Sequence, residues 1–336
     1  MAVEADKGVE KLEDVIVRSA EQVAEQIRAA RDAISTVIFG QDRVVENTLV
    51  TILSGGHALL IGVPGLAKTK LVETLGVTLG LDAKRVQFTP DLMPSDILGA
   101  EVLDEDSTGK RSFRFIAGPV FAQLLMADEI NRASPRTQSA LLQAMQEQHI
   151  TVAGARHDLP KPFHVLATQN PLEQEGTYPL PEAQLDRFLM EIDVDYPDRD
   201  AERRILFETT GAEETLAKAA MSADVVLAAQ RLVRRLPVGD SVVEAILSLV
   251  RSARPGPESG DAGKLIAWGP GPRASQSLML AVRARALLDG RLAPSIDDVI
   301  DLAEPVLKHR MALTFAARAE GRTISDVIGQ LKTRIG

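Results

Sequence analysis

The chain has 336 residues, of which 45% are hydrophobic and 25% charged, so it is long enough for two folded domains. A net charge of −9 argues against a surface that binds nucleic-acid backbones throughout, and the absence of cysteine excludes disulfide bonds and thiolate metal sites. The acidic N-terminal residues and the lack of a long apolar run predict neither a signal peptide nor a membrane span, and we therefore expect a cytoplasmic protein.

The N-terminal region is predicted to be helical. Apolar residues recur with a period close to 3.6 between Lys11 and Ala33, and a further helix is predicted over residues 42–54. Between them lies a small apolar turn, where the backbone at Ile38 and Gly40 is suited to read the edge of an adenine base. A turn that only packs into the core would give the same pattern.

A glycine-rich turn joins a predicted strand, residues 58–61, to a predicted helix that ends at Leu79. Strand, turn and helix with Lys-Thr at its start are the context of a phosphate-binding P-loop. Backbone N–H groups and the helix N-terminus would form the anion site, with Lys68 at the β- and γ-phosphates and the Thr69 hydroxyl on Mg²⁺. Ala67 replaces the usual last glycine, and alanine is compatible there with the geometry of a helical first turn. The nucleotide-binding candidates are Gly62, Val63, Pro64, Gly65, Leu66, Ala67, Lys68, Thr69 and Lys70.

Two acidic residues follow the third predicted strand. After a second strand at residues 85–89, residues 90–118 are broken by Pro and Gly and predict an insertion with a hairpin between Glu101 and Ile116. The apolar run Leu124–Ala127 then ends in Asp128 and Glu129, as a buried parallel strand with carboxylates at its end would. Asp128 would hold Mg²⁺, and Glu129 would polarise the water that attacks the γ-phosphate.

The fourth predicted strand ends in a candidate water-positioning residue. A helix over residues 136–148 and a hairpin around Gly154 precede the buried strand of residues 163–170. Asn170, at its end, would position the attacking water between strands. An asparagine that only closes the turn before Pro171 is an equally good reading.

The last part of the chain is predicted to be mostly helical. A short predicted helix carries Arg187, a fifth strand covers residues 189–194, and the charged run after Pro197 predicts a linker. Helices without strands are predicted beyond it, at residues 222–234, 238–253, 273–288, 295–315 and 325–332. Arg273 falls in the first turn of one of them, where it opposes the helix dipole; a facing phosphate would explain it, although a surface arginine is also possible.

These motifs resemble those of the AAA+ ATPases, and within them the MoxR family. Residues 62–69 resemble Walker A and residues 124–129 Walker B, with Asn170 similar to the sensor-1 asparagine. The segment 180–188 resembles the arginine-finger segment, with Arg187 as the finger, and residues 268–273 resemble sensor 2. Residues 90–118 are similar to the helix-2 insert, and residues 149–164 to the presensor hairpin, of the clade that includes the MCM helicases. The resemblance covers about residues 35–320.

The resemblance implies an α/β fold, an αβα core with strand order 5-1-4-3-2, followed by a helical lid. We place the N-terminal helices and core in residues 1–197 and the lid in residues 198–336. ATP and Mg²⁺ would bind between core, lid and a neighbouring subunit. An arginine finger implies a homo-oligomeric ring, a hexamer in the usual arrangement. The implied partners are protein clients, with a von Willebrand A-domain protein among the candidates, and no nucleic acid.

The function predicted from these features is ATP-driven, chaperone-like remodelling of protein complexes. Two alternatives belong to other classes. A nucleic-acid translocase is suggested by the MCM-like inserts but opposed by the acidic net charge. A nucleotide-switched scaffold with negligible turnover is opposed by the full set of catalytic residues. Whether Arg273 serves its own subunit or a neighbour remains open at this stage.

Overall fold

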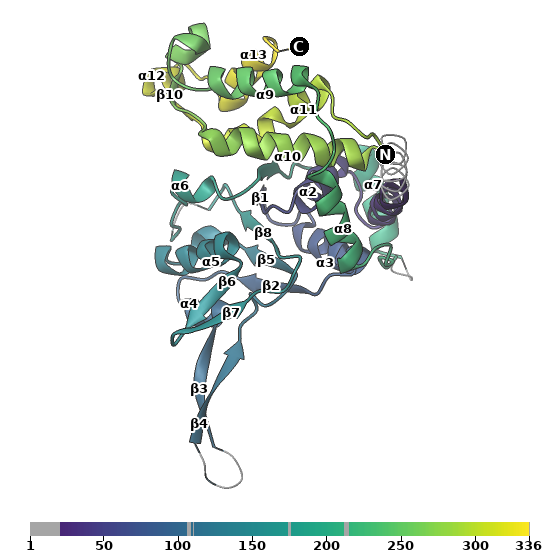
Figure 1. The fold of residues 1–336 in the computed structure, drawn as a ribbon, viewed down its shortest axis with the longest axis vertical. Coiled ribbons are helices and arrows are strands. Elements are labelled where there is room, and N and C mark those ends of the chain that lie inside the picture. The colour runs from purple at the N-terminus through teal and green to yellow at the C-terminus, as the bar shows by residue number, and fades with distance from the viewer. Residues whose placement is uncertain (1–20, 106–108, 110, 174–175, 212–214, 336) are drawn as a thin grey trace, which may run out of the picture.

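Five strands form the central sheet of the structure, a computed structural model that describes residues 21–105, 109, 111–173, 176–211 and 215–335 (Figure 1). The strands are β1 (Ala58–Ile61), β2 (Ala83–Gln87), β5 (Leu124–Asp128), β8 (His164–Gln169) and β9 (Met190–Asp193). They lie in the order β2-β5-β8-β1-β9, and every neighbouring pair is parallel. This is the predicted 5-1-4-3-2 order, and it confirms the α/β fold class.

Both faces of the sheet are covered by helices. Successive residues of a strand point to opposite faces, and along β5 Leu124 and Met126 enter one apolar cluster whereas Leu125 and Ala127 enter another. The first cluster contains residues of α2 (Asp42–Leu53) and α3 (Lys68–Leu79), and the second those of α5 (Pro135–Glu147). The sheet is thus the middle of three layers, which explains why its inner strands are apolar along their length.

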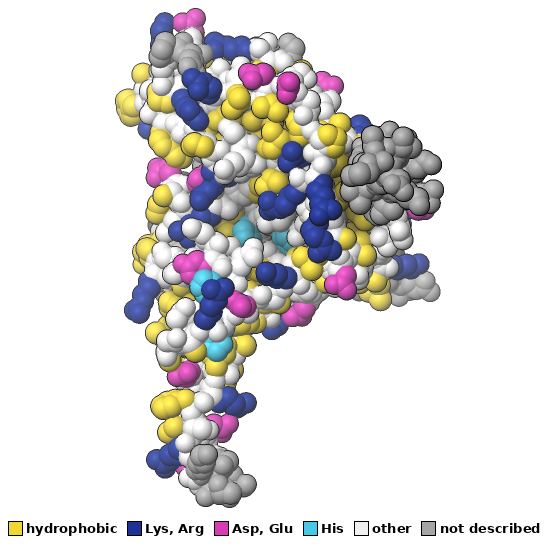
Figure 2. Space-filling model, viewed as in Figure 1, with side chains coloured by type: hydrophobic (Ala, Val, Ile, Leu, Met, Phe, Trp, Pro, Cys, Tyr) yellow, Lys and Arg dark blue, Asp and Glu magenta, His cyan; other side chains and the backbone are white. Residues whose placement is uncertain are grey.

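Two hairpins extend from this core, as the sequence predicts. The first joins β3 (Gly99–Glu105) to β4 (Arg111–Ala117) after the short helix α4 (Pro94–Leu98), and it projects away from the sheet (Figure 1). The second joins β6 (His149–Val152) to β7 (Ala155–Asp158). On the projecting hairpin hydrophobic and charged side chains are interspersed at the surface (Figure 2), and Phe113 is 71% exposed.

The C-terminal part is mostly helical. Its long helices are α7 (Arg199–Thr209), α8 (Ala223–Val233), α9 (Asp240–Ser252), α10 (Pro272–Leu288), α11 (Ile296–Leu307) and α13 (Ile324–Lys332). Its shorter elements are η2 (Pro257–Lys264), η3 (Lys308–Arg310), α12 (Phe315–Ala319), β10 (Ile266–Trp268) and β11 (Ala312–Leu313). In the N-terminal region residues 21–35 are helical, and the first part of that predicted helix lies outside the described residues. The core also contains η1 (Ile130–Arg132) and α6 (Glu182–Leu185).

Two predictions for the C-terminal part are wrong. The charged run after Pro197 is the start of α7 rather than a linker, because Asp198 caps the helix by accepting the N–H of Ala201 at 2.8 Å. The helix predicted over 295–315 ends at Leu307, and the chain then turns through η3 into β11, which pairs with β10. These strands are too short to show a periodicity of their own.

The C-terminal helices share one apolar interior with the core. Residues of α8, α10 and α11 belong to the same buried cluster as those of α2, α3 and β9, and the α10 and α2 helices lie against one another. Ion pairs cross the same contact, among them Arg285 of α10 with Glu46 of α2 at 3.4 Å. No helix within the described ranges is long and apolar enough to cross a membrane. The division at residue 197 stays a prediction.

Two buried histidines make the stability of this core dependent on pH. Burial lowers the pKa of His57 to about 3 and that of His164 to about 4, and the nearness of His164 lowers that of His57 further. The unfolded chain, with histidine pKa values near 6.5, therefore binds protons at mildly acidic pH, whereas the native state does not. We expect full stability above pH 6.5 and a loss on the order of 2 kcal/mol per histidine at pH 5.

Urea unfolding at pH 7.5 and pH 5.0 measures this effect. His164→Asn keeps a donor for the Gly56 carbonyl, which the His164 ring contacts at 2.8 Å, but removes the titrating group. The variant is expected to lose distinctly less stability on acidification than the wild type. An unchanged pH dependence in the variant would contradict the assignment.

Candidate nucleotide-binding site

The lysine side chain of the P-loop contacts the backbone at the start of the same loop. Helix α3 begins at Lys68, whose ammonium donates to the carbonyl oxygens of Gly62 and Val63, the second at 3.1 Å. Burial lowers the pKa of Lys68, while Asp128 and Glu129 act in the opposite direction. Lys68 thus places a cation at the N-terminus of α3, where the free backbone N–H groups and the helix dipole also favour an anion.

Ala67 differs from the sequence prediction. It does not take a helical first-turn geometry but caps α3 in the left-handed conformation, with φ 56° and ψ 19°. An L-residue with a Cβ pays roughly 1–2 kcal/mol there, which a glycine would not. The usual glycine at this position is thus explained by backbone conformation, a property that the helical pattern downstream does not reveal.

Ala67→Gly should accordingly stabilise the protein by about 0.5–1 kcal/mol, since the relief of strain exceeds the added entropy of the unfolded chain. Urea unfolding followed by circular dichroism measures it. Ala140→Gly, in the middle of helix α5, is the matched control and should destabilise by roughly 0.5–1 kcal/mol. A loss of stability in both variants would refute the strain at Ala67.

The two acids at the end of β5 are linked through one hydroxyl. Thr168 donates to Asp128 Oδ1 at 2.6 Å and accepts the backbone N–H of Glu129 at 2.8 Å. Glu129 itself has φ 54°, a left-handed conformation that is uncommon for a residue with a side chain. Strained backbone of this kind clusters at functional sites. Thr168 lies on the neighbouring strand β8, so the sheet order brings the three residues together.

Three further side chains reach these acids, and the sequence analysis did not identify any of them. Gln87 and Arg132 both donate to Glu129 Oε2, at 2.7 and 2.8 Å. Arg85 donates to Asp128 Oδ2 from two nitrogens, at 2.6 and 3.1 Å. The available signal was positional: Arg85 and Gln87 lie toward the carboxyl end of a parallel strand adjacent to β5, the edge at which ligands of such sheets bind.

Arg85 and Gln87, together with the two acids, line one cavity of about 470 Å³, the P-loop cavity. Its walls are the P-loop from Pro64 to Lys70, the two acids, and Asn170. The Asn170 side chain also accepts the N–H of Leu172 at 3.1 Å, so its turn-closing role and its place at the cavity are both present. The Thr69 hydroxyl and the Asp128 carboxylate are oxygen ligands of the kind Mg²⁺ prefers, and the donor set fits that ion.

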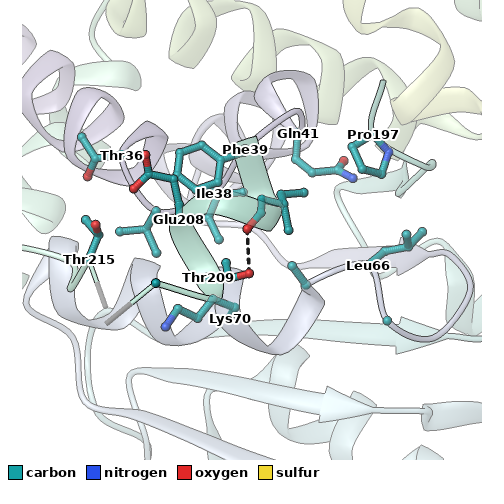
Figure 3. A pocket seen from close by; sticks show the side chains of 15 residues that line it. Thr36, Ile38, Phe39, Gln41, Leu66, Lys70, Pro197, Glu208, Thr209 and Thr215 are labelled. Atoms are coloured by element: carbon teal, nitrogen blue, oxygen red, sulfur yellow. Dashed lines mark hydrogen bonds between the residues drawn. The ribbon is translucent and has the colours of Figure 1, made fainter. Parts of the chain in front are cut away.

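A second, more apolar cavity of about 580 Å³ continues from the first, with which it shares four P-loop residues: Gly65, Leu66, Ala67 and Lys70. Ile38, Phe39 and the end of α7 line it (Figure 3). Gly40 is not among its lining residues; its φ is +68°, and a Cβ there would lie 2.4 Å from that of Ala201. The sequence did not reveal that α7 lines this cavity, because the charged run after Pro197 predicted a linker.

The two candidate arginines lie together but away from the P-loop. Arg187 stands two residues beyond the end of α6 rather than on it, and Arg273 lies in the first turn of α10 as predicted. Both line a third cavity, of about 180 Å³, together with Arg234 and Arg310, and we call it the arginine cavity. Arg273 donates to Asp186 Oδ2 at 3.2 Å. The structure therefore assembles Lys68, Thr69, Asp128, Glu129 and Asn170 at one site, and Arg187 with Arg273 at another.

Comparisons with known proteins identify two domain families along the chain. Residues 57–190 match the ATPase family associated with various cellular activities (AAA), and residues 261–331 match the AAA lid domain. The chain is 42% identical to Chaperone MoxR1 of Mycobacterium tuberculosis over 317 residues, which cover 93% of this chain and 83% of that protein. It is 33% identical to protein MoxR of Paracoccus denitrificans over 307 residues, 86% of this chain and 89% of that protein.

A solved structure from Cytophaga hutchinsonii, of a protein provisionally described as an ATPase, superposes with a TM-score of 0.87 at 35% identity and covers 96% of this chain and 97% of that one. The fold, the P-loop cavity and the relatives thus lead to one conclusion: the chain belongs to the MoxR family of AAA+ ATPases.

Proposed function

We propose that this protein is a ring-forming, Mg²⁺-dependent ATPase that uses hydrolysis to remodel protein complexes. The observation that carries the proposal is the separation of the catalytic groups into two sites, each incomplete alone. The P-loop cavity holds the groups for binding and for activating water, whereas the two arginines that would neutralise transition-state charge line a different cavity.

In the P-loop cavity, the chain's own groups have distinct tasks. Backbone N–H groups and Lys68 would bind the phosphates, and Glu129 would take a proton from the attacking water, which Asn170 would orient. Thr69 and Asp128 would hold Mg²⁺, whose chemistry when bound is to neutralise charge on the β- and γ-phosphate oxygens. The adjoining apolar cavity, with Ile38 on its wall, would receive the base.

The position of the two arginines favours action on a neighbouring subunit. His57, which precedes β1, lines the arginine cavity, whereas Gly62 at the other end of β1 begins the P-loop. Five residue steps along a strand correspond to roughly 16 Å. This separation supports Arg187 and Arg273 both acting in trans, in a ring for which six is the expected number of subunits. The sequence did not decide whether Arg273 acts in its own subunit or on a neighbour, and this separation favours the neighbour.

The relatives are described as a chaperone and as MoxR proteins, which favours protein clients; a von Willebrand A-domain partner stays a candidate. The test of the whole proposal is the ATPase rate against protein concentration, with molar mass measured by light scattering. Specific activity should rise together with assembly. Activity independent of concentration would refute a shared site, and a salt-sensitive stimulation by DNA would point to a translocase instead.

A further inference from the structure

One arginine is buried completely beneath the arginine cavity. Arg310, in η3, is 1% exposed and is the largest fully buried side chain of the described residues. A buried charge is costly unless it is paired and hydrogen-bonded. Its Nε donates to Asp186 Oδ1 at 2.7 Å, and its remaining nitrogens donate to main-chain oxygens of Asp186, Phe188 and Leu189, among others. Arg310 thus fixes the backbone on both sides of Arg187.

The partner of Arg310 is shared with Arg273. Asp186 uses one carboxylate oxygen for the buried Arg310 and the other for Arg273, whose side chain is 47% exposed. Arg187 is the next residue in the chain. The Asp186 carboxylate therefore connects Arg273 directly, and Arg187 through the backbone, to the buried Arg310. It also joins the core, which supplies Asp186, to the C-terminal helices, which supply both of its partners.

We propose that Asp186 and Arg310 are positioning residues, which hold Arg187 and Arg273 in the geometry needed at a neighbouring subunit's ATP. The inference rests on the proposed function, in which these two arginines act in trans. Neither Asp186 nor Arg310 lines the P-loop cavity. Arg310 sets the direction of the Arg187 backbone, and Asp186 orients the Arg273 guanidinium. Because Arg187 belongs to the core and Arg273 to the C-terminal helices, movement of one part relative to the other would change the geometry of the pair.

Asp186→Asn is the sharpest variant. The amide keeps the size of the carboxylate and one acceptor for Arg310, but its NH₂ group faces the Arg273 donors without accepting from them. We expect assembled rings of this variant to hydrolyse ATP about 10²-fold more slowly, the usual effect of a misplacement near 1 Å. Nucleotide affinity of the variant's own P-loop should be unchanged, because the P-loop cavity lies at the other end of β1.

Mixed rings separate positioning from structural damage. Glu129→Gln subunits have an inactive P-loop site but intact arginines, so they should restore hydrolysis at the sites of Asp186→Asn subunits. If Asp186→Asn does not assemble alone, it is incorporated as a minority subunit into Glu129→Gln rings and compared with wild type incorporated at the same ratio. Equal activity of the rings that contain Asp186→Asn and those that contain wild type supports the proposal. Lower activity of the Asp186→Asn rings overturns it, because the fault would then lie within the variant's own site or fold.

Two controls complete the experiment. Glu46→Gln removes another ion pair between the core and α10, and should leave the ATPase rate unchanged. Arg187→Ala tests the proposed function itself. Suppose that Arg187→Ala is slow and is rescued in mixed rings, whereas Asp186→Asn is fully active. This result would refute the positioning role of Asp186 but not the proposed function. A fully active Arg187→Ala would refute the trans site on which it rests.

Discussion

Arg187→Ala is expected to assemble normally and to hydrolyse ATP about 10³-fold or more slowly than the wild type, since an arginine that stabilises transition-state charge contributes roughly 10³–10⁵ in rate. Expressed as a barrier, this is about 4–7 kcal/mol. Arg187 lies beyond the end of α6, at the cavity that β1 separates from the P-loop, and its proposed action is therefore on a neighbouring subunit's ATP. Steady-state ATPase assays on rings verified by light scattering measure the effect.

The size of the effect should depend on the shape of the side chain as well as its charge. Arg187→Lys keeps a cation but loses the planar fork of the guanidinium, and an intermediate rate is expected. Arg318→Ala, which removes an exposed arginine of α12, is the control for a general loss of positive charge and should be fully active. Wild-type rates in assembled Arg187→Ala rings would exclude a role for Arg187 in hydrolysis.

Glu129→Gln is expected to bind ATP with nearly wild-type affinity and to lose turnover by about 10²–10⁴-fold, the usual contribution of a general base. The amide has the size of the carboxylate and can still accept from Gln87 and Arg132, which contact Glu129 Oε2 at 2.7 and 2.8 Å. The cavity should therefore keep its shape while it loses the group that removes the proton of water.

Binding of a fluorescent ATP analogue, measured beside single-turnover hydrolysis, separates the two effects. Glu244→Gln, an exposed residue of α9, is the matched loss of one carboxylate and should change neither quantity. Hydrolysis that persists in Glu129→Gln would require another base. A loss of binding would instead indicate that Glu129 supports the structure of the P-loop cavity.

The P-loop site was largely predictable because its residues follow from local patterns. Each of its main contributors stands at the end of an apolar strand, and parallel strands carry their carboxyl ends to the same edge. Thus the spacing of Lys68, Asp128 and Asn170 in the sequence sufficed to group them, and the structure places all three at one cavity. Arg85 and Gln87 were missed because their strand is short and half-polar, with no motif of its own.

The sequence by itself determined the five strands of the central sheet, the P-loop, the pair of acids and the place of Arg273 in a helical first turn, since these depend on near neighbours in the chain. Tertiary structure decided what those patterns leave open. It placed α7 beside the apolar cavity, held Ala67 in a left-handed cap, and gave Asp186 two arginine partners from distant segments. The physical reason is that backbone strain and the pairing of buried charges depend on groups brought together by folding, which no periodicity along the chain records.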